Sequence, residues 1–292
     1  MNFALMSEST AREENTTKKK GTKGKNRVGE MSFLEHLEEL RWHIIRSFLA
    51  IIVMAVVAFV AKNFIFDEII FKPKLPEFWT NRMFAKMGDW LGTESIKINQ
   101  SDLKLISIQM AGQFSVHMWT ALIAGFILAS PFVFFEFWRF IRPALYENEK
   151  RHASGAVFYT SVLFILGVLF GYYLIVPLSI HFLGSYNISN EVTNQININS
   201  YISTVVSVCL ASGVVFLLPI FSYFLSKVGI ITPSFMKKYR RHAYVLLLLL
   251  SAIITPPDIF SQIMVCIPLV MLYELSIFIS GRVEKKREKS KA

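Results

Sequence analysis

The stretch that decides the fold is Ser154-Gly-Ala-Val-Phe-Tyr-Thr-Ser-Val-Leu-Phe-Ile-Leu-Gly-Val-Leu-Phe-Gly-Tyr-Tyr-Leu-Ile-Val176, which contains no charged side chain. A helix needs about 20 consecutive apolar residues to cross the hydrocarbon core of a membrane. The whole chain is 53% hydrophobic, with a mean hydropathy of +0.44. The predicted spans are 42–65, 115–137, 154–176, 202–225, 242–255 and 259–280. The sequence therefore predicts an all-α, polytopic membrane protein with six spans.

Lysine and arginine are unevenly distributed between the segments that connect these spans. They gather in both tails and in the loops after spans two and four, whereas the loop at 177–201 contains neither. Because basic residues collect in cytoplasmic loops, both termini are expected in the cytoplasm. The long loop at 66–111 mixes both signs and is expected outside. The net charge of +10 thus has a topological cause. Nucleic acid binding is not expected, since no basic face alternates with stacking aromatics.

The organisation along the chain follows from composition. Residues 1–30 are polar and lack an apolar signal-peptide core, so we expect a disordered cytoplasmic tail. Residues 31–281 form the predicted six-helix membrane domain, and residues 282–292 a basic cytoplasmic tail. Cys209 and Cys266 lie inside apolar runs, and their spacing fits neither a disulfide framework nor a metal site. No metal or cofactor is expected.

An acidic run precedes the first span: Met31-Ser-Phe-Leu-Glu-His-Leu-Glu-Glu-Leu-Arg41. Its spacing predicts a helix lying on the membrane surface, begun by a capping box of Ser32 and Glu35. Glu39 lies four residues after Glu35, on the same helical face. One reading is a solvated acidic face whose Glu39 is offset by Arg41. The other is a receptor for something positive, because these acids lie on the side where lysine and arginine predominate.

A second acidic spot, with Glu147 and Glu149, follows span two. Acids near the start of the next helix are favourable by about 0.3–1 kcal/mol, which is a purely structural explanation. Both acidic spots nevertheless lie on the same side of the membrane, against the local charge. Together they weaken the purely structural explanation.

The spans themselves contain few ionisable groups. Glu274 lies toward the cytoplasmic end of span six, where its side chain could reach the interface. No chain of acids or histidines crosses the midplane, so a proton relay has little support. No nucleophile–base pair is evident, so an enzyme is not expected. Span five is short, and Thr255-Pro-Pro-Asp258 turns the chain so that Asp258 can cap span six. A small-molecule secondary transporter and a structural assembly hub stay open as alternatives.

Four motifs carry a resemblance to a known family. Phe33-Leu-Glu-His-Leu-Glu-Glu-Leu-Arg41 resembles the N-terminal signature of TatC, the large polytopic subunit of the twin-arginine protein translocase. The other three motifs are Pro131-Phe-Val-Phe-Phe-Glu-Phe-Trp-Arg-Phe-Ile-Arg-Pro-Ala-Leu-Tyr-Glu-Asn-Glu-Lys-Arg151, Phe170-Gly-Tyr-Tyr-Leu-Ile-Val-Pro177 and Thr255-Pro-Pro-Asp-Ile-Phe-Ser-Gln262. Their order and spacing agree with the family over about residues 31–281.

The resemblance implies six helices in a concave, glove-like arrangement, with the last two too short to span. It implies an inner-membrane receptor for signal peptides with two adjacent arginines. It also implies work with TatA-type and, in many bacteria, TatB single-span partners, self-association in the complex, and transport of folded proteins driven by the proton motive force.

Individual residues carry over from the family to this chain. The acids that recognise the arginine pair fall on Glu39 and Glu149, with Arg41 as the family's N-terminal arginine. Structural or partner-contact roles fall on four positions: Asp258, Pro143, Leu217 and Glu274. Two positions depart from the family: His43 replaces a second basic residue, and Leu217 replaces a polar residue associated with partner docking.

Overall fold

The computed structural model describes residues 33–93, 97–99, 103–141, 153–189, 191, 194–255 and 259–289. The α-helices are α2 (Phe33–Val60), α3 (Trp79–Leu91), α4 (Gly112–Ile141), α6 (Ala153–Phe170), α7 (Val176–Ser185), α8 (Ile198–Val215), α9 (Leu218–Val228), α10 (Pro233–Lys238), α11 (Arg240–Ile254) and α12 (Ile259–Lys289). Two π-helices, η1 (Phe64–Ile70) and η5 (Gly171–Ile175), a 3-10 turn η2 (Lys72–Lys74) and two short strands, β1 (Leu105–Ile106) and β2 (Ile196–Asn197), complete the elements.

Within the described part of the chain, five helical segments are long and apolar enough to cross a membrane: Leu37–Val60, Gly112–Ile141, Gly155–Ser185, Ile198–Val228 and Ser261–Lys285. They correspond to predicted spans one, two, three, four and six, so the all-α polytopic class is confirmed. The 15 residues of α11 correspond to span five. At about 1.5 Å per residue they extend about 22 Å, against a hydrocarbon core of about 30 Å. Span five is short, as expected.

Two expectations about helix extent are wrong. The acidic run is not a separate surface helix, because α2 begins at Phe33 and continues without a break into the first span. No glycine or proline occurs within α2, so nothing interrupts its hydrogen bonding. The last helix is also not short: α12 has 31 residues, carries Pro268 inside it and continues through the basic segment to Lys289.

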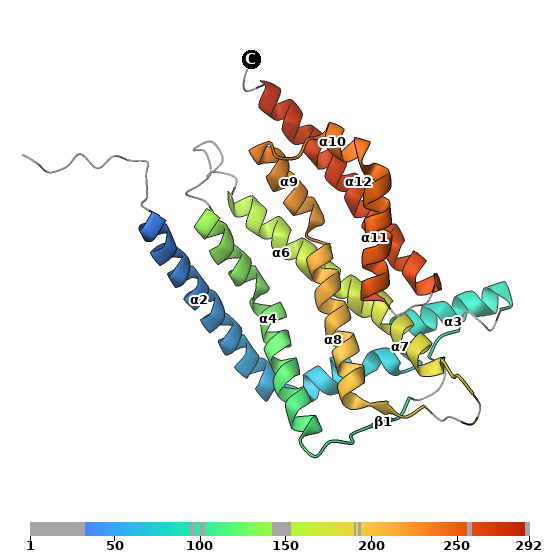
Figure 1. The fold of residues 1–292 in the computed structure, drawn as a ribbon. Coiled ribbons are helices and arrows are strands. Elements are labelled where there is room, and N and C mark those ends of the chain that lie inside the picture. Colours follow the sequence, from blue (N-terminus) through green and yellow to red (C-terminus); the bar gives the residue numbers. More distant parts are fainter. Residues whose placement is uncertain are drawn as a thin grey trace, which may run out of the picture. The chain divides into compact units, whose positions relative to one another are not determined.

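The chain divides into two compact units, Met1–Arg41 and Trp42–Ala292, and the packing described below belongs to the second. Within that unit α8 packs on α4 and α6, and α9 and α11 pack on α12 (Figure 1). Glycines permit the close approach of α6 to α8. A Cβ placed on Gly167 would lie 2.7 Å from the carbonyl oxygen of Ser212, a distance that real Cβ atoms do not adopt. Small residues play this role where membrane helices touch.

The helix of span four is interrupted between α8 and α9. The chain turns at Phe216 and Leu217, and Pro219 follows in the first turn of α9. Proline has no N–H to donate back to the preceding turn, so it suits the start of a new helix rather than the interior of a long one.

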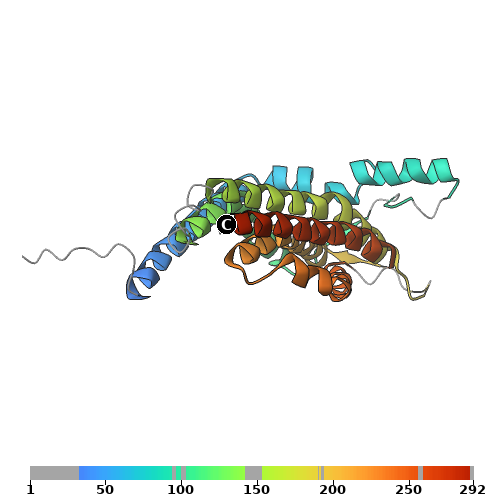
Figure 2. The same cartoon turned by 90° about the horizontal axis from the view of Figure 1, so that it is seen from above.

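One end of the second unit, where α2 ends and α4 begins, holds most of the connecting structure; we call it the cap end. Asn81 anchors it, because its side-chain amide donates to the carbonyl oxygens of Pro73 (2.9 Å) and Leu75 (2.7 Å). Asn99 donates in turn to Asn81 Oδ1 (3.2 Å) and to the carbonyl of Pro177 (3.0 Å). This network fixes the segment before α4 to the start of α7. Figure 2 shows α3 projecting to one side of the spanning helices at this end.

Candidate functional site

The N-terminal turns of α2 carry the acidic run. Glu39 is half-buried, whereas its neighbour Glu38 and Arg41 are exposed. Glu149, Pro143 and Asp258 lie outside the described residues, so the pairing of Glu39 with Glu149 stays a prediction.

Two residues after Arg41, His43 makes a buried contact that the sequence did not reveal. His43 Nδ1 contacts a carboxylate oxygen of Glu136 on α4. Their exposed fractions are only 6% and 2%, and the ring of Phe140 lies edge-on to the imidazole at 6.1 Å. The signal available in the sequence was a lone glutamate in an otherwise apolar helix, because such a group requires a partner when it is buried.

The last turns of α4 are also held to α6. The indole Nε1 of Trp138 donates to Thr160 Oγ1 over 3.2 Å, and both residues are buried. The helix end that leads into the segment containing Glu149 is therefore fixed on two sides, by α2 through Glu136 and by α6 through Trp138. This end, where α4 ends and α6 begins, we call the tail end.

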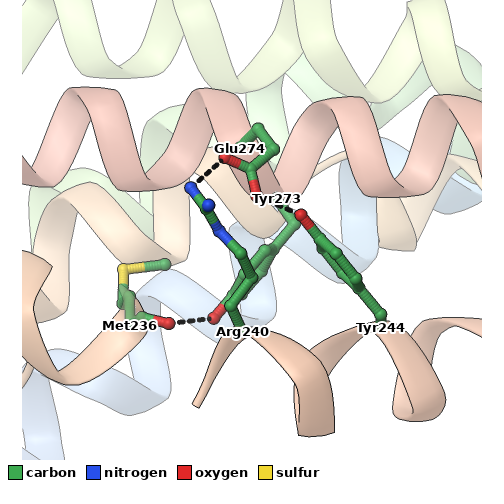
Figure 3. A network of polar contacts seen from close by, with 5 residues as sticks. All are labelled: Met236, Arg240, Tyr244, Tyr273 and Glu274. Atoms are coloured by element: carbon green, nitrogen blue, oxygen red, sulfur yellow. Dashed lines mark hydrogen bonds and ion pairs between the residues drawn. The ribbon is translucent and has the colours of Figure 1, made fainter. Parts of the chain in front are cut away.

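Glu274 joins α11 to α12 at the tail end (Figure 3). Arg240 Nη2 donates to Glu274 Oε2 over 2.6 Å, and the hydroxyl of Tyr244 donates to Glu274 Oε1 over 2.5 Å. The adjacent Tyr273 hydroxyl donates to the backbone carbonyl of Met236 over 3.0 Å. From its position in the sequence, the Glu274 side chain could reach the membrane interface by itself. Instead its carboxylate is held between two donors from α11, which makes it a connector of helices.

Leu217 is 7% exposed and lies at the break between α8 and α9. Its side chain offers no hydrogen bond there, so a polar contact of the kind associated with this position in the family is absent from this chain. The break itself remains, because Pro219 is retained.

One cavity of about 400 Å³ opens at the cap end. Its lining combines Lys62, Asp67 and His117 with several phenylalanines. His117 is a packed structural residue, since its ring stacks on Phe59 at 4.0 Å and its Nε2 lies 3.1 Å from the Phe59 carbonyl oxygen. The cavity lies at the end of the helices rather than near their middle, so it lends no support to a small-molecule transporter. Among the described residues, no three or more His, Cys, Asp or Glu side chains gather as metal ligands.

Comparison with known proteins gives a consistent picture. Residues 35–268 match the family described as "Sec-independent protein translocase protein (TatC)". The TatC protein of Blattabacterium sp. subsp. Periplaneta americana is 44% identical over 265 residues, covering 90% of this chain and 100% of that protein. The TatC protein of Aquifex aeolicus is 33% identical over 264 residues, covering 90% and 100%.

A solved structure is similar as well. A crystal structure described as the twin-arginine translocase receptor TatC superposes with a TM-score of 0.65 at 32% identity. The superposition covers 85% of this chain and 100% of that one. The similarity therefore extends from sequence to fold over most of the chain.

Proposed function

This chain belongs to the TatC family of Sec-independent protein translocase proteins, and we propose that it is the receptor for twin-arginine signal peptides in that translocase. The observation that carries the proposal is the family match over residues 35–268, which includes the acidic run at Glu39. A protein described as the twin-arginine translocase receptor shares its fold.

The proposed recognition site consists of Glu39 and Glu149, each serving one arginine of the signal peptide, with Arg41 beside them. A carboxylate binds the planar guanidinium group through two parallel hydrogen bonds, which an ammonium group cannot reproduce. This chemistry favours two arginines over two lysines. The half-buried setting of Glu39 supports its role, because partial shelter from water strengthens a charge-assisted hydrogen bond.

Arginine recognition supplies selection more than affinity. An exposed ion pair contributes only about 0.2–1 kcal/mol, so two such pairs do not hold a peptide tightly. The apolar segment of the signal peptide supplies most of the binding free energy by packing against apolar helix surfaces. Partial burial of the carboxylates makes each arginine contact contribute more to the binding free energy than a fully exposed ion pair would.

The proposed setting is the bacterial inner membrane, with the tail end and both termini in the cytoplasm. Described basic residues at the tail end support this orientation, among them Arg139 at the end of α4 and Lys237 and Lys238 on α10. In this setting the protein works with TatA-type single-span partners, joined by TatB in many members of the family, self-associates, and moves folded proteins with the proton motive force. It performs no enzymatic reaction of its own.

The break between α8 and α9 is where the proposed partner contacts differ from the family pattern. Leu217 removes the polar group at the α8–α9 break, so partner docking relies on other residues. Asp258 and Pro143, like Glu274, are proposed to have structural or partner-contact roles.

The test is photo-crosslinking of a twin-arginine precursor to the reconstituted protein. Glu39→Gln and Glu149→Gln should each reduce crosslinking toward the level of a twin-lysine precursor, because the amide cannot form the charged pair. Glu38→Gln is the matched control: it changes the neighbouring exposed acid in the same way. Crosslinking that is unchanged in both Glu39→Gln and Glu149→Gln would contradict the site.

A further inference from the structure

The helix α3 has one face that is firmly attached to the protein. Thr80, Asn81 and Phe84 on that face are at most 1% exposed. The hydroxyl of Thr80 donates to the backbone carbonyl of Tyr173, which lies in the π-helix η5. Phe84 packs in a small core with Ile98 and Leu178. The orientation of α3 about its own axis is therefore fixed.

The opposite face is exposed and combines aromatic with basic side chains. Trp79, Arg82, Lys86 and Trp90 follow one another at steps of three and four residues, which places them on one side of a helix. Trp79 is 60% exposed and Trp90 85% exposed, and Met87 beside them is 41% exposed. Two tryptophans held in water by a fixed helix expose apolar surface without benefit, so this face requires a partner.

The charge of this face is positive. Arg82 and Lys86 are both exposed. The one acid on α3, Asp89, forms an ion pair with Lys97 over 2.8 Å. The remaining basic groups therefore face outward without compensation from within the helix, which suits an anionic partner such as a layer of phosphate groups.

The same face continues the lipid-facing surface of a span. The Trp79 ring contacts the Tyr173 ring at a centroid distance of 6.4 Å, and Phe78 stacks on Tyr173 at 5.5 Å. Tyr173 belongs to the segment Gly155–Ser185 that is long and apolar enough to cross the membrane, and it is 42% exposed. Figure 1 shows α3 lying across the direction of the spanning helices at the cap end. Tryptophan and basic side chains in this position are typical of a helix in the membrane interface.

We propose that the Trp79–Arg82–Lys86–Trp90 face of α3 binds the lipid headgroup layer at the cap end. The tryptophan rings lie at the boundary between headgroups and acyl chains, and Arg82 and Lys86 bind lipid phosphates. The proposal rests on the membrane location of the protein and not on signal-peptide recognition. In the orientation proposed above, the headgroup layer at the cap end belongs to the outer leaflet, and the proposal itself does not depend on that orientation.

The test uses the full chain in lipid nanodiscs and the fluorescence of its own tryptophans. The difference between the wild type and the Trp79→Phe/Trp90→Phe variant isolates the two rings from the other tryptophans, of which the chain has five in all. This difference signal should be quenched by lipids with a nitroxide on the headgroup and resist aqueous iodide. A signal quenched by iodide and unaffected by the labelled lipid would overturn the proposal. So would protection from iodide that requires an added single-span partner, because the face would then bind protein.

A second arm tests the phosphate contacts without altering the tryptophans. Lys86→Glu should weaken quenching of the two rings by headgroup-labelled lipid in anionic nanodiscs, because the new carboxylate repels phosphate. Lys104→Glu is the matched control, since Lys104 is also exposed and lies between α3 and α4 but not on α3. Equal quenching in the wild type and both variants would contradict the proposed binding of lipid phosphates by the basic residues of α3. A loss of the same size in both variants would point to net charge alone and would also overturn it.

Discussion

His43 and Glu136 are buried against each other between α2 and α4. Removing one partner of this buried pair leaves the other without a hydrogen bond in the interior, which costs about 1–3 kcal/mol. We expect His43→Leu and Glu136→Leu each to lower the free energy of unfolding by about 3 kcal/mol. The measurement is thermal unfolding of the protein in detergent.

The double variant distinguishes the pair from simple loss of packing. Replacing both partners of a buried pair by apolar residues is often neutral, so His43→Leu/Glu136→Leu should recover most of the lost stability. A double variant less stable than either single variant would show that the two side chains act independently.

The same pair shows where residue-level inference from sequence ends. His43 was noted only as a departure from the family, and Glu136 appeared only within the second of the four family motifs. The two are separated by 93 positions, and helical periodicity contains no information on which faces of two distant helices meet. Glu274 was identified from the sequence because it is an acid within an apolar span. Its two hydrogen-bond donors on α11 could not be identified in the same way, because they depend on how α11 packs on α12.

At the scale of elements, α2 packs on α4 through a glycine. A Cβ on Gly125 would lie 2.5 Å from the backbone nitrogen of Ala55. Gly125→Val should therefore push the two helices apart and destabilise the protein by about 1–3 kcal/mol. Gly155→Val is the control, since the nearest atom to its Cβ is 4.0 Å away. Comparable melting temperatures for Gly125→Val and the wild type would contradict the close approach.

Helix lengths were predicted well where apolar runs alone decide them and less well at their ends. The acidic run was predicted as a helix separate from span one because the composition of the chain changes near Arg41. The helix continues because no breaking residue interrupts it. Composition reports the environment of a segment, whereas continuity depends on backbone hydrogen bonds that charged and apolar residues form equally well.

The short helix α11 gives a second prediction at this scale. Because its 15 residues extend only about 22 Å, we expect it to thin the bilayer locally, where partners assemble. Insertion of four leucines in its middle should impair transport of a twin-arginine precursor while signal-peptide crosslinking survives. Transport at the wild-type rate would mean that the shortness of α11 has no role in assembly. The hypothesis of local thinning applies to α11 alone. The neighbouring helix α12 has 31 residues and is long enough to cross the hydrocarbon core.

For the whole molecule, the membrane class and the order of the spans could be read from sequence because the hydrophobic effect acts on each long apolar run separately. The contacts between spans could not. The close approach of Gly167 to the Ser212 backbone and the hydrogen bond between Ser226 and Ser280 at 2.6 Å join helices that are distant in sequence. Glycine and serine have small side chains, and nothing in one amino-acid sequence distinguishes those at helix contacts from those elsewhere.

The proposed orientation of the whole molecule in the membrane rests on the distribution of basic residues and can be measured directly. Glu191, in the connection after α7, and Lys238, at the end of α10, are exposed and fall on opposite sides in the proposed orientation. In a variant whose Cys209 and Cys266 are replaced by alanine, Glu191→Cys should react with a membrane-impermeant thiol reagent added outside the cytoplasmic membrane. Lys238→Cys should react only after permeabilisation, because the positive-inside rule retains that loop in the cytoplasm. The reverse pattern of labelling would invert the orientation, and α3 would then lie in the inner leaflet with its headgroup contacts intact.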